Sequence, residues 1–253
     1  MYLGGLANLV GSLHYWMPGT KIAVFNLGLQ ADELQEVASW RDCVLHWRET
    51  GPPPDLCIDG QWKPAPHLRH LQKYAWKPPA IVEAVEAYGA VLWLDAGCDV
   101  RGRLDGIASA LSRDGYFLVK GQDLDMTARL QPDCASRLGL RAADFVGKPS
   151  FAGGVQGYVR GSAAAGQILR PLYAAAADES CIAPAGSSLQ NHRYDQSLLS
   201  LIAYSCGLRL KEHTKLLSAS RAELSTDPRK PSRRRIYTAR CSSVEYIRYL
   251  ERN

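Results

Sequence analysis

The strongest constraint on the fold is a short apolar run that ends at an acidic residue. Residues 90–99 read AVLWLDAGCD, in which positions 91–94 are branched or aromatic and Asp95 follows directly. Such a run is typical of a strand buried on both faces at the centre of a parallel sheet. Open α/β sheets bind their ligands at the carboxyl ends of these strands. Asp95 is therefore a candidate ligand residue, with an aspartate that only shapes a turn as the alternative.

Helical and strand-like patterns alternate on both sides of this run. Apolar residues at helical spacing predict helices over 3–16, 31–40, 80–88, 104–113, 162–177 and 198–206. Apolar runs predict strands over 21–27, 42–47, 90–94, 116–120 and 150–160, and the proline-rich segment 48–66 reads as a loop. This alternation predicts an α/β fold with a mostly parallel central sheet flanked by helices.

Composition narrows the class of protein only moderately. The 253 residues are 46% hydrophobic and 22% charged, as in a soluble globular protein, with a formal charge of +5. That charge favours a phosphorylated ligand weakly and does not require nucleic acid. The seven cysteines form no C-x-x-C pair, so neither a zinc site nor a disulfide framework is predicted and a reducing compartment is favoured.

Three short motifs then carry a family resemblance. LDAG at 94–97, FAGG at 151–154 and YDQS at 194–197 occur in this order, after a Lys77 that precedes two prolines. With the order of elements, they make the chain resemble the GT-A nucleotide-sugar glycosyltransferases over roughly residues 5–215. The likeness is greatest to glycogenin-like transferases and to small relatives that carry WLDAG and YDQS.

The resemblance implies a single GT-A-like, Rossmann-like domain over 1–253. Its nucleotide-sugar-binding half would span 1–120 and its less regular acceptor-side half 121–220, followed by a basic tail and helix over 221–253. The donor would be a UDP-sugar or a GDP-sugar, and the acceptor a carbohydrate hydroxyl. A cytoplasmic location is expected if the chain is complete, and the Golgi lumen if it is an excised domain.

The family also implies Mn²⁺ or Mg²⁺ at an Asp-x-Asp turn, a site that this chain matches only in part. Asp95 occupies the first acidic position and binds donor or metal, but Gly97 stands at the second, beside the donor. Either Asp99 replaces the second acid as a metal ligand, or basic side chains balance the diphosphate without a strong metal site.

The remaining predicted donor-binding residues each have a structural alternative. Lys77 is assigned to the donor phosphates or sugar, against a solvated lysine. Gly153 and Gly154 are assigned to the donor sugar, against a bulge in a strand. Gln196 is assigned to the sugar pocket, and Asp195 is the candidate catalytic base of an inverting transferase or holds the sugar in a retaining one. An aspartate that caps a helix is the alternative for Asp195.

Other notable residues are interpreted as structural. Tyr74 and Trp76 could stack on a base, but aromatic residues beside prolines are more often core. His213 could be a late metal ligand, and a structural role is favoured. The basic run 229–235 reads as a solvated segment, with an anionic membrane surface, and so a peripheral membrane association, as its alternative.

Two other functions compete with a sugar transferase. A GT-A-like module that binds nucleotide or glycan with little or no turnover fits Gly97, and it fits the absence of the family's opening strand ahead of the first helix, which suggests a truncated start. A nucleotidyltransferase would need a glycine-rich and basic phosphate loop near its start. Residues 1–20 contain neither lysine nor arginine.

Overall fold

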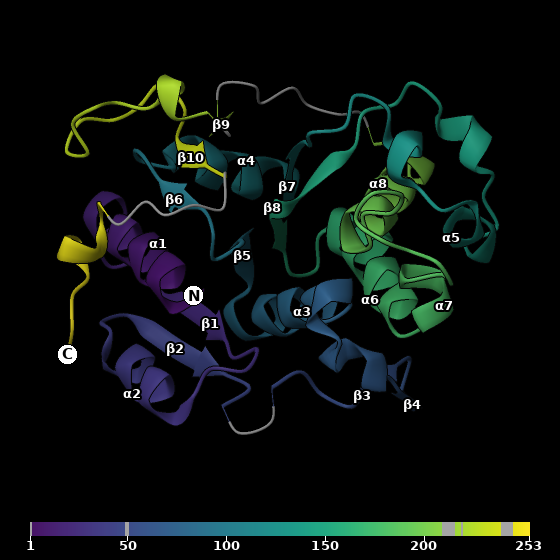
Figure 1. Cartoon of the computed structure of the whole chain (residues 1–253), viewed down its shortest axis with the longest axis horizontal. Coiled ribbons are helices and arrows are strands. Elements are labelled where there is room, and N and C mark those ends of the chain that lie inside the picture. Colours follow the sequence, from purple (N-terminus) through teal and green to yellow (C-terminus); the bar gives the residue numbers. More distant parts are fainter. Residues whose placement is uncertain (1, 49–50, 209–215, 219, 239–244) are drawn as a thin grey trace. The chain divides into compact units, whose positions relative to one another are not determined.

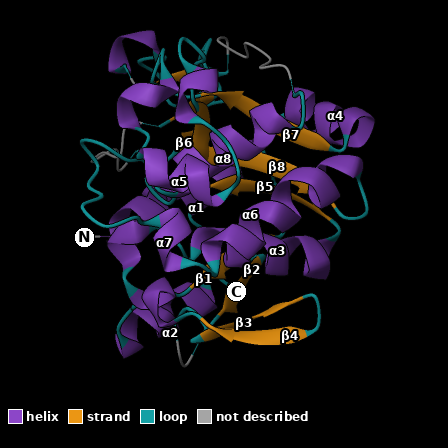
Figure 2. Ribbon diagram, turned by 90° about the vertical axis from the view of Figure 1, so that its right-hand side faces the viewer, coloured by secondary structure: helices purple, strands orange, loops and turns teal. Residues whose placement is uncertain are grey.

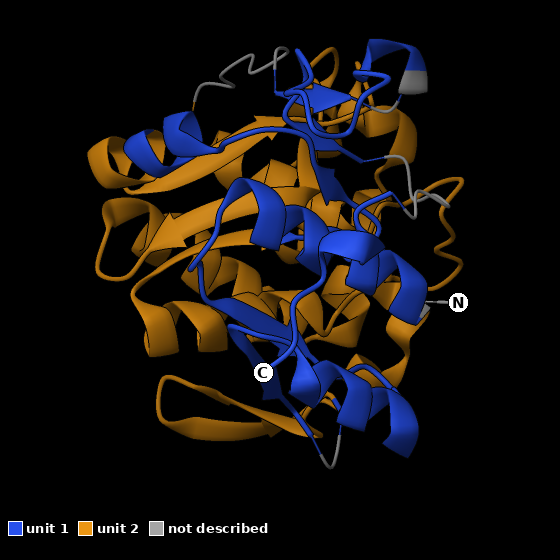
Figure 3. Cartoon of the chain, turned by 90° about the vertical axis from the view of Figure 1, so that its left-hand side faces the viewer, with its two compact units in different colours: residues 1–51, 94–109, 213–253 blue, residues 52–93, 110–212 orange. Residues whose placement is uncertain are grey.

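The computed structural model describes residues 2–48, 51–208, 216–218, 220–238 and 245–253 (Figure 1). The chain is an α/β protein that forms two compact units (Figure 3). Unit 1 consists of residues 1–51, 94–109 and 213–253, and unit 2 of residues 52–93 and 110–212. The predicted single domain with boundaries at 120 and 220 stays a prediction.

Unit 1 begins with the elements that its sequence predicts. Its helices are α1 (Tyr2–Trp16) and α2 (Ala31–Ser39), and its strands are β1 (Ile22–Phe25), β2 (Cys43–His46), β6 (Asp99–Val100), β9 (Leu217–Ser218) and β10 (Ile236–Tyr237). β1 and β2 pair in parallel, with α2 as their connection, which confirms a βαβ start. Apolar residues of α1, β1 and α2 form the core of this unit. No helix among the described residues is long and apolar enough to cross a membrane.

Unit 2 contains a three-stranded sheet in the order β5 (Ala90–Leu94), β8 (Phe151–Val159), β7 (Tyr116–Lys120). β7 and β8 are antiparallel. The predicted central strand at 90–94 is therefore wrong for this sheet, because the longer β8 takes the middle position and β5 an end. Side chains 91–94 are accordingly half-buried rather than buried on both faces.

The described strands do not form the predicted single sheet. They form four small sheets, two of two strands and two of three, with both parallel and antiparallel pairs. The α/β class holds, while one long parallel sheet is not present in the described part of the chain.

A hairpin lies where the sequence predicts only a loop. β3 (Asp55–Ile58) and β4 (Gln61–Pro64) pair antiparallel across Asp59 and Gly60 (Figure 2). Both turn residues have positive φ, 51° and 80°, as a two-residue turn of type I′ requires. An Asp-Gly pair is a known signal for this turn. The loop prediction over 48–66 is therefore wrong for residues 55–64.

The helices of unit 2 pack against one another. They are α3 (Lys77–Tyr88), α5 (Pro132–Arg137), α6 (Arg170–Ala176), α7 (Glu179–Ile182) and α8 (Asp195–Ser205), and α4 (Asp105–Asp114) runs from unit 1 into unit 2. Short 3-10 turns cover Pro66–Arg69, Leu71–Lys73, Met126–Arg129, Ala142–Phe145, Arg221–Glu223 and Ile247–Tyr249, and a π turn, Ala165–Leu169, precedes α6.

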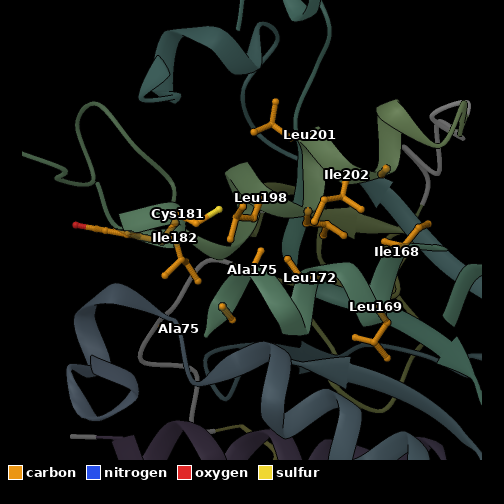
Figure 4. Packing of buried hydrophobic residues seen from close by; sticks show 14 of the residues in the cluster. Ala75, Ile168, Leu169, Leu172, Ala175, Cys181, Ile182, Leu198, Leu201 and Ile202 are labelled. Carbon is orange, nitrogen blue, oxygen red and sulfur yellow. The ribbon is translucent and has the colours of Figure 1, made fainter. Parts of the chain in front are cut away.

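Helix α8 is buried in the core of unit 2. Figure 4 shows Leu198, Leu201 and Ile202 of α8 among side chains of α6 and α7, such as Leu172 and Ile182. These residues are buried, and α8 also contacts β8. The beginning of α8 is therefore held against β8, where the YDQS and FAGG motifs meet.

Candidate functional site

Lys77 is buried at the first position of α3. Pro78 and Pro79 occupy the rest of that first turn, where the missing proline N–H groups leave no helical hydrogen bond unmade. The lysine is only 2% exposed, and its Nζ lies 3.0 Å from Oδ2 of Asp195. The alternative of a solvated lysine is therefore wrong.

Asp195 is the first residue of α8 and is 5% exposed. A carboxylate in the first turn of a helix is stabilised by the helix dipole. The cap position itself belongs to Tyr194, so Asp195 is not the helix cap. Tyr194 adopts φ 47°, a conformation that costs free energy for a residue with a side chain and that often occurs at functional sites.

Two aromatic rings lie near the ammonium group of Lys77. The Nζ of Lys77 lies 5.3 Å from the ring centroid of Tyr74 and 5.9 Å from that of Trp76, within the range of cation–π attraction. Tyr74 also has a positive φ, 54°, and its ring centroid lies 6.3 Å from that of Tyr194. Trp76 is buried and donates its indole N–H to the Leu71 carbonyl, which supports its predicted core role.

The FAGG segment is an irregular part of β8. Its ladder with β7 pairs Leu118 with Gln156 but Lys120 with Phe151, so two steps along β7 match five along β8. A side chain at Gly153 would place its Cβ 2.9 Å from Oδ2 of Asp195. The glycine is thus required by the close approach of α8, and the interrupted ladder supports the bulge alternative.

The other predicted donor residues of unit 2 lie beside this contact. Gly154 follows on β8 and is half-buried. Gln196 is half-buried at the start of α8 and donates its amide to the hydroxyl of Ser150, 2.9 Å away. Their assignment to the donor sugar stays a prediction.

Asp95 and Gly97 lie in a turn of unit 1 that follows β5. The carbonyl of Asp95 accepts a hydrogen bond from the N–H of Cys98 at 2.8 Å, and both Asp95 and Gly97 are half-buried. The backbone geometry is that of the turn alternative. Binding of a donor or a metal by the Asp95 side chain stays a prediction.

Asp99 has other partners than the predicted metal. It is buried on β6, and its two oxygens accept from Nε and Nη2 of Arg101 at 3.0 and 2.8 Å. The amide of Asn8 lies 3.3 Å from the same carboxylate, and Arg101 also contacts Glu245 at 2.5 Å. Among the described residues, no three His, Cys, Asp or Glu side chains come together as a metal site would require.

The C-terminal basic run is in part held in ion pairs. Arg229 pairs with Asp227, and Arg234 pairs with Glu223. The backbone N–H of Ser232 donates to the carbonyl of Arg101, the residue that follows β6. His213 lies outside the described residues.

Sequence reasoning missed two buried polar residues of β8, Gln156 and Tyr158. Their side chains share one face of the strand, since they are two residues apart. The available signal was a glutamine inside a run of otherwise apolar and small residues. Arg101 was missed as well, because nothing local marks an arginine that will be buried by distant chain segments.

Comparisons of the chain with protein-family models, with curated proteins and with solved structures find no match. The site is therefore interpreted from its geometry. It places an ammonium group, which suits a phosphate, beside a carboxylate, which suits a hydroxyl proton. Tyr74, near the ammonium, and Tyr194, next to the carboxylate in the chain, both have a positive φ.

Proposed function

We propose that the chain is a nucleotide-sugar glycosyltransferase with a GT-A-like fold. It would move a sugar from a UDP-sugar or GDP-sugar to a hydroxyl of a carbohydrate acceptor. The observation that carries this proposal is the meeting of Lys77, Gly153 and Asp195 in unit 2. The resemblance assigns Lys77 and Gly153 to the donor and Asp195 to the acceptor proton or the sugar, although they belong to motifs far apart in the sequence. Motifs that matched by chance would have no reason to converge.

In this proposal the two charged groups have different tasks. The Lys77 ammonium balances negative charge on the donor, and its contact with Asp195 keeps it at a fixed position. The Asp195 carboxylate accepts the acceptor proton in an inverting reaction or holds the sugar in a retaining one. The backbone strain at the adjacent Tyr194 supports a functional role for the Lys77–Asp195 pair.

The predicted Mn²⁺ or Mg²⁺ fits the described residues poorly. Asp99, the expected second ligand, already accepts two hydrogen bonds from Arg101, and a metal ion would have to displace them. We therefore derive no step through a metal. Asp95 keeps its proposed role as a donor-binding residue, tested by Asp95→Asn, which we expect to weaken donor binding at least about tenfold.

A binding module without turnover is the second candidate. It is favoured by Gly97 at the position of the family's second acid and by the burial of Asp195, which limits access of a hydroxyl to its carboxylate. The two candidates differ only in whether a bound donor reacts.

Donor hydrolysis and donor binding separate the candidates. UDP- and GDP-sugars are screened by thermal shift, with and without manganese, since a bound donor raises the melting temperature. Hydrolysis of the best donor is then measured for the wild type, Asp195→Asn and Lys77→Met. Lys73→Met is the matched control, because Lys73 pairs with Glu179 near the surface of the same unit.

We expect slow hydrolysis in the wild type and in Lys73→Met, and at least about a hundredfold loss in Asp195→Asn. Binding without hydrolysis under every condition would support the module. A chain that binds no nucleotide-sugar at all would overturn the transferase and the nucleotide-binding form of the module. Circular dichroism of each variant shows whether it is folded.

A further inference from the structure

A row of buried hydrogen bonds leads from the middle of β8 to the Lys77–Asp195 pair. The hydroxyl of Tyr158 donates to Oε1 of Gln156 at 3.0 Å. The amide of Gln156 donates to the carbonyl of Gly153 at 2.9 Å, and Nζ of Lys77 donates to the same carbonyl at 3.4 Å. Gln156 is 1% exposed and Tyr158 is 0% exposed, so water does not substitute for these partners.

The irregular ladder is what brings the Gly153 carbonyl into this row. Between Phe151 and Gln156, β8 has more residues than the facing part of β7, Leu118 to Lys120. A bulged segment is unpaired on that side and needs other groups to hold it. The side chain of Gln156 performs that function three residues away from the carbonyl it binds.

Packing alone does not account for two polar side chains at this depth. A buried hydroxyl and a buried amide each cost free energy unless they are hydrogen-bonded, and apolar side chains of similar size would avoid that cost. Burial also raises the pKa of the Tyr158 hydroxyl, which therefore stays a neutral donor. The direction of donation is then fixed from Tyr158 through Gln156 to Gly153.

We propose that Gln156 and Tyr158 are positioning residues for Lys77. Tyr158 orients the Gln156 amide, the amide holds the bulged Gly153 carbonyl, and that carbonyl and Asp195 together fix the ammonium of Lys77. This positioning role extends the proposed function. It rests on that function only for the reaction that the Lys77–Asp195 pair would serve. The arrangement itself is testable without any substrate.

The first test observes the Lys77 ammonium directly. Protein labelled with ¹⁵N-lysine is studied by proton–nitrogen NMR, and the Lys77 signal is assigned by its loss in Lys77→Met. In Tyr158→Phe and in Gln156→Met we expect the exchange of the Lys77 ammonium protons with water to accelerate by about tenfold, the factor that matches the loss of roughly one hydrogen bond.

Tyr204→Phe is the matched control. The Tyr204 hydroxyl donates to the Pro149 carbonyl at 2.7 Å, and its ring contacts Phe151, so this variant also removes one hydrogen bond near β8. We expect it to leave the Lys77 signal unchanged. Equal exchange in Tyr158→Phe, Tyr204→Phe and the wild type, with all three folded, would overturn the proposal.

The second test uses catalysis. If the chain hydrolyses a donor, Tyr158→Phe should lower kcat while KM changes little, since a displaced Lys77 affects the reacting state more than donor affinity. A fall in kcat of the same size in Tyr204→Phe would assign both effects to general loosening and contradict the proposal. If no donor reacts in any protein, the proposed function fails, and the NMR comparison still decides the positioning role.

Discussion

At the scale of single residues, Gly153 shows how a glycine can serve packing beside a candidate site. The carbonyl of this residue accepts from two side chains, and its α-carbon faces Asp195. A methyl group there would have to move the carboxylate or the start of α8. The requirement for glycine thus arises inside the protein, whatever the ligand.

We expect Gly153→Ala to lower the free energy of unfolding by about 1–3 kcal/mol, because the new Cβ would lie 2.9 Å from Oδ2 of Asp195. Gly166→Ala is the comparison, since nothing lies within 4 Å of its Cβ position. That variant should be neutral or stabilising by about 0.4–1 kcal/mol, through the unfolded chain. Urea unfolding measures both, and equal losses would contradict the packing argument.

At the scale of elements, local patterns predicted helices and short strands well. Helix α1, the βαβ start and β7 can each be predicted from the spacing of apolar residues that are close together in the sequence. The place of β8 does not, because neighbours in a sheet are chosen by long-range pairing and burial. The two glycines of the FAGG segment raise a bulge only as an alternative, because the pairing with β7 that decides it is long-range.

The candidate site could be predicted to a similar degree. Lys77 and Asp195 were found because their motifs resemble a family, and the structure joins them. Asp99, the predicted second metal ligand beside Asp95, accepts two hydrogen bonds from Arg101, and its role as a ligand stays a prediction. A buried ion pair between residues two apart depends on the segments that cover it, which the local sequence does not describe.

The β3–β4 hairpin offers a prediction for one element. Gly60→Ala should weaken the hairpin by about 1 kcal/mol, because φ 80° is unfavourable for a residue with a Cβ. Amide exchange of residues 55–58 and 61–63 should then accelerate about fivefold, while that of β7 and β8 stays the same. Unchanged exchange in the hairpin would show that its turn tolerates a side chain.

At the scale of the whole molecule, one buried histidine makes stability depend on pH. His192 donates from Nε2 to the Ile182 carbonyl at 3.0 Å, and its Nδ1 accepts from the N–H of Gln131 at 3.3 Å. Burial lowers its pKa from 6.5 to about 4, against a smaller opposing effect of the Ile182 hydrogen bond. Between these values the unfolded chain binds a proton that the folded chain does not.

Stability should therefore be full above about pH 6.5 and fall as the pH drops towards 4, by up to about 3 kcal/mol from this group. We expect His192→Gln to be less stable at neutral pH, through the loss of a fitted ring, and to lack this part of the pH dependence. Urea unfolding at a series of pH values compares the two proteins. Parallel curves between pH 6.5 and 4 would contradict the assignment to His192.

The chain passes between the two units at four places, after residues 51, 93, 109 and 212. A cut at any one of these crossings divides unit 1 between the two fragments, whereas a cut after residue 51 or after residue 212 leaves unit 2 whole. Splitting the gene at a crossing would thus never yield unit 1 from one fragment. Only co-expression of both fragments, with reassembly of the pieces, would restore it.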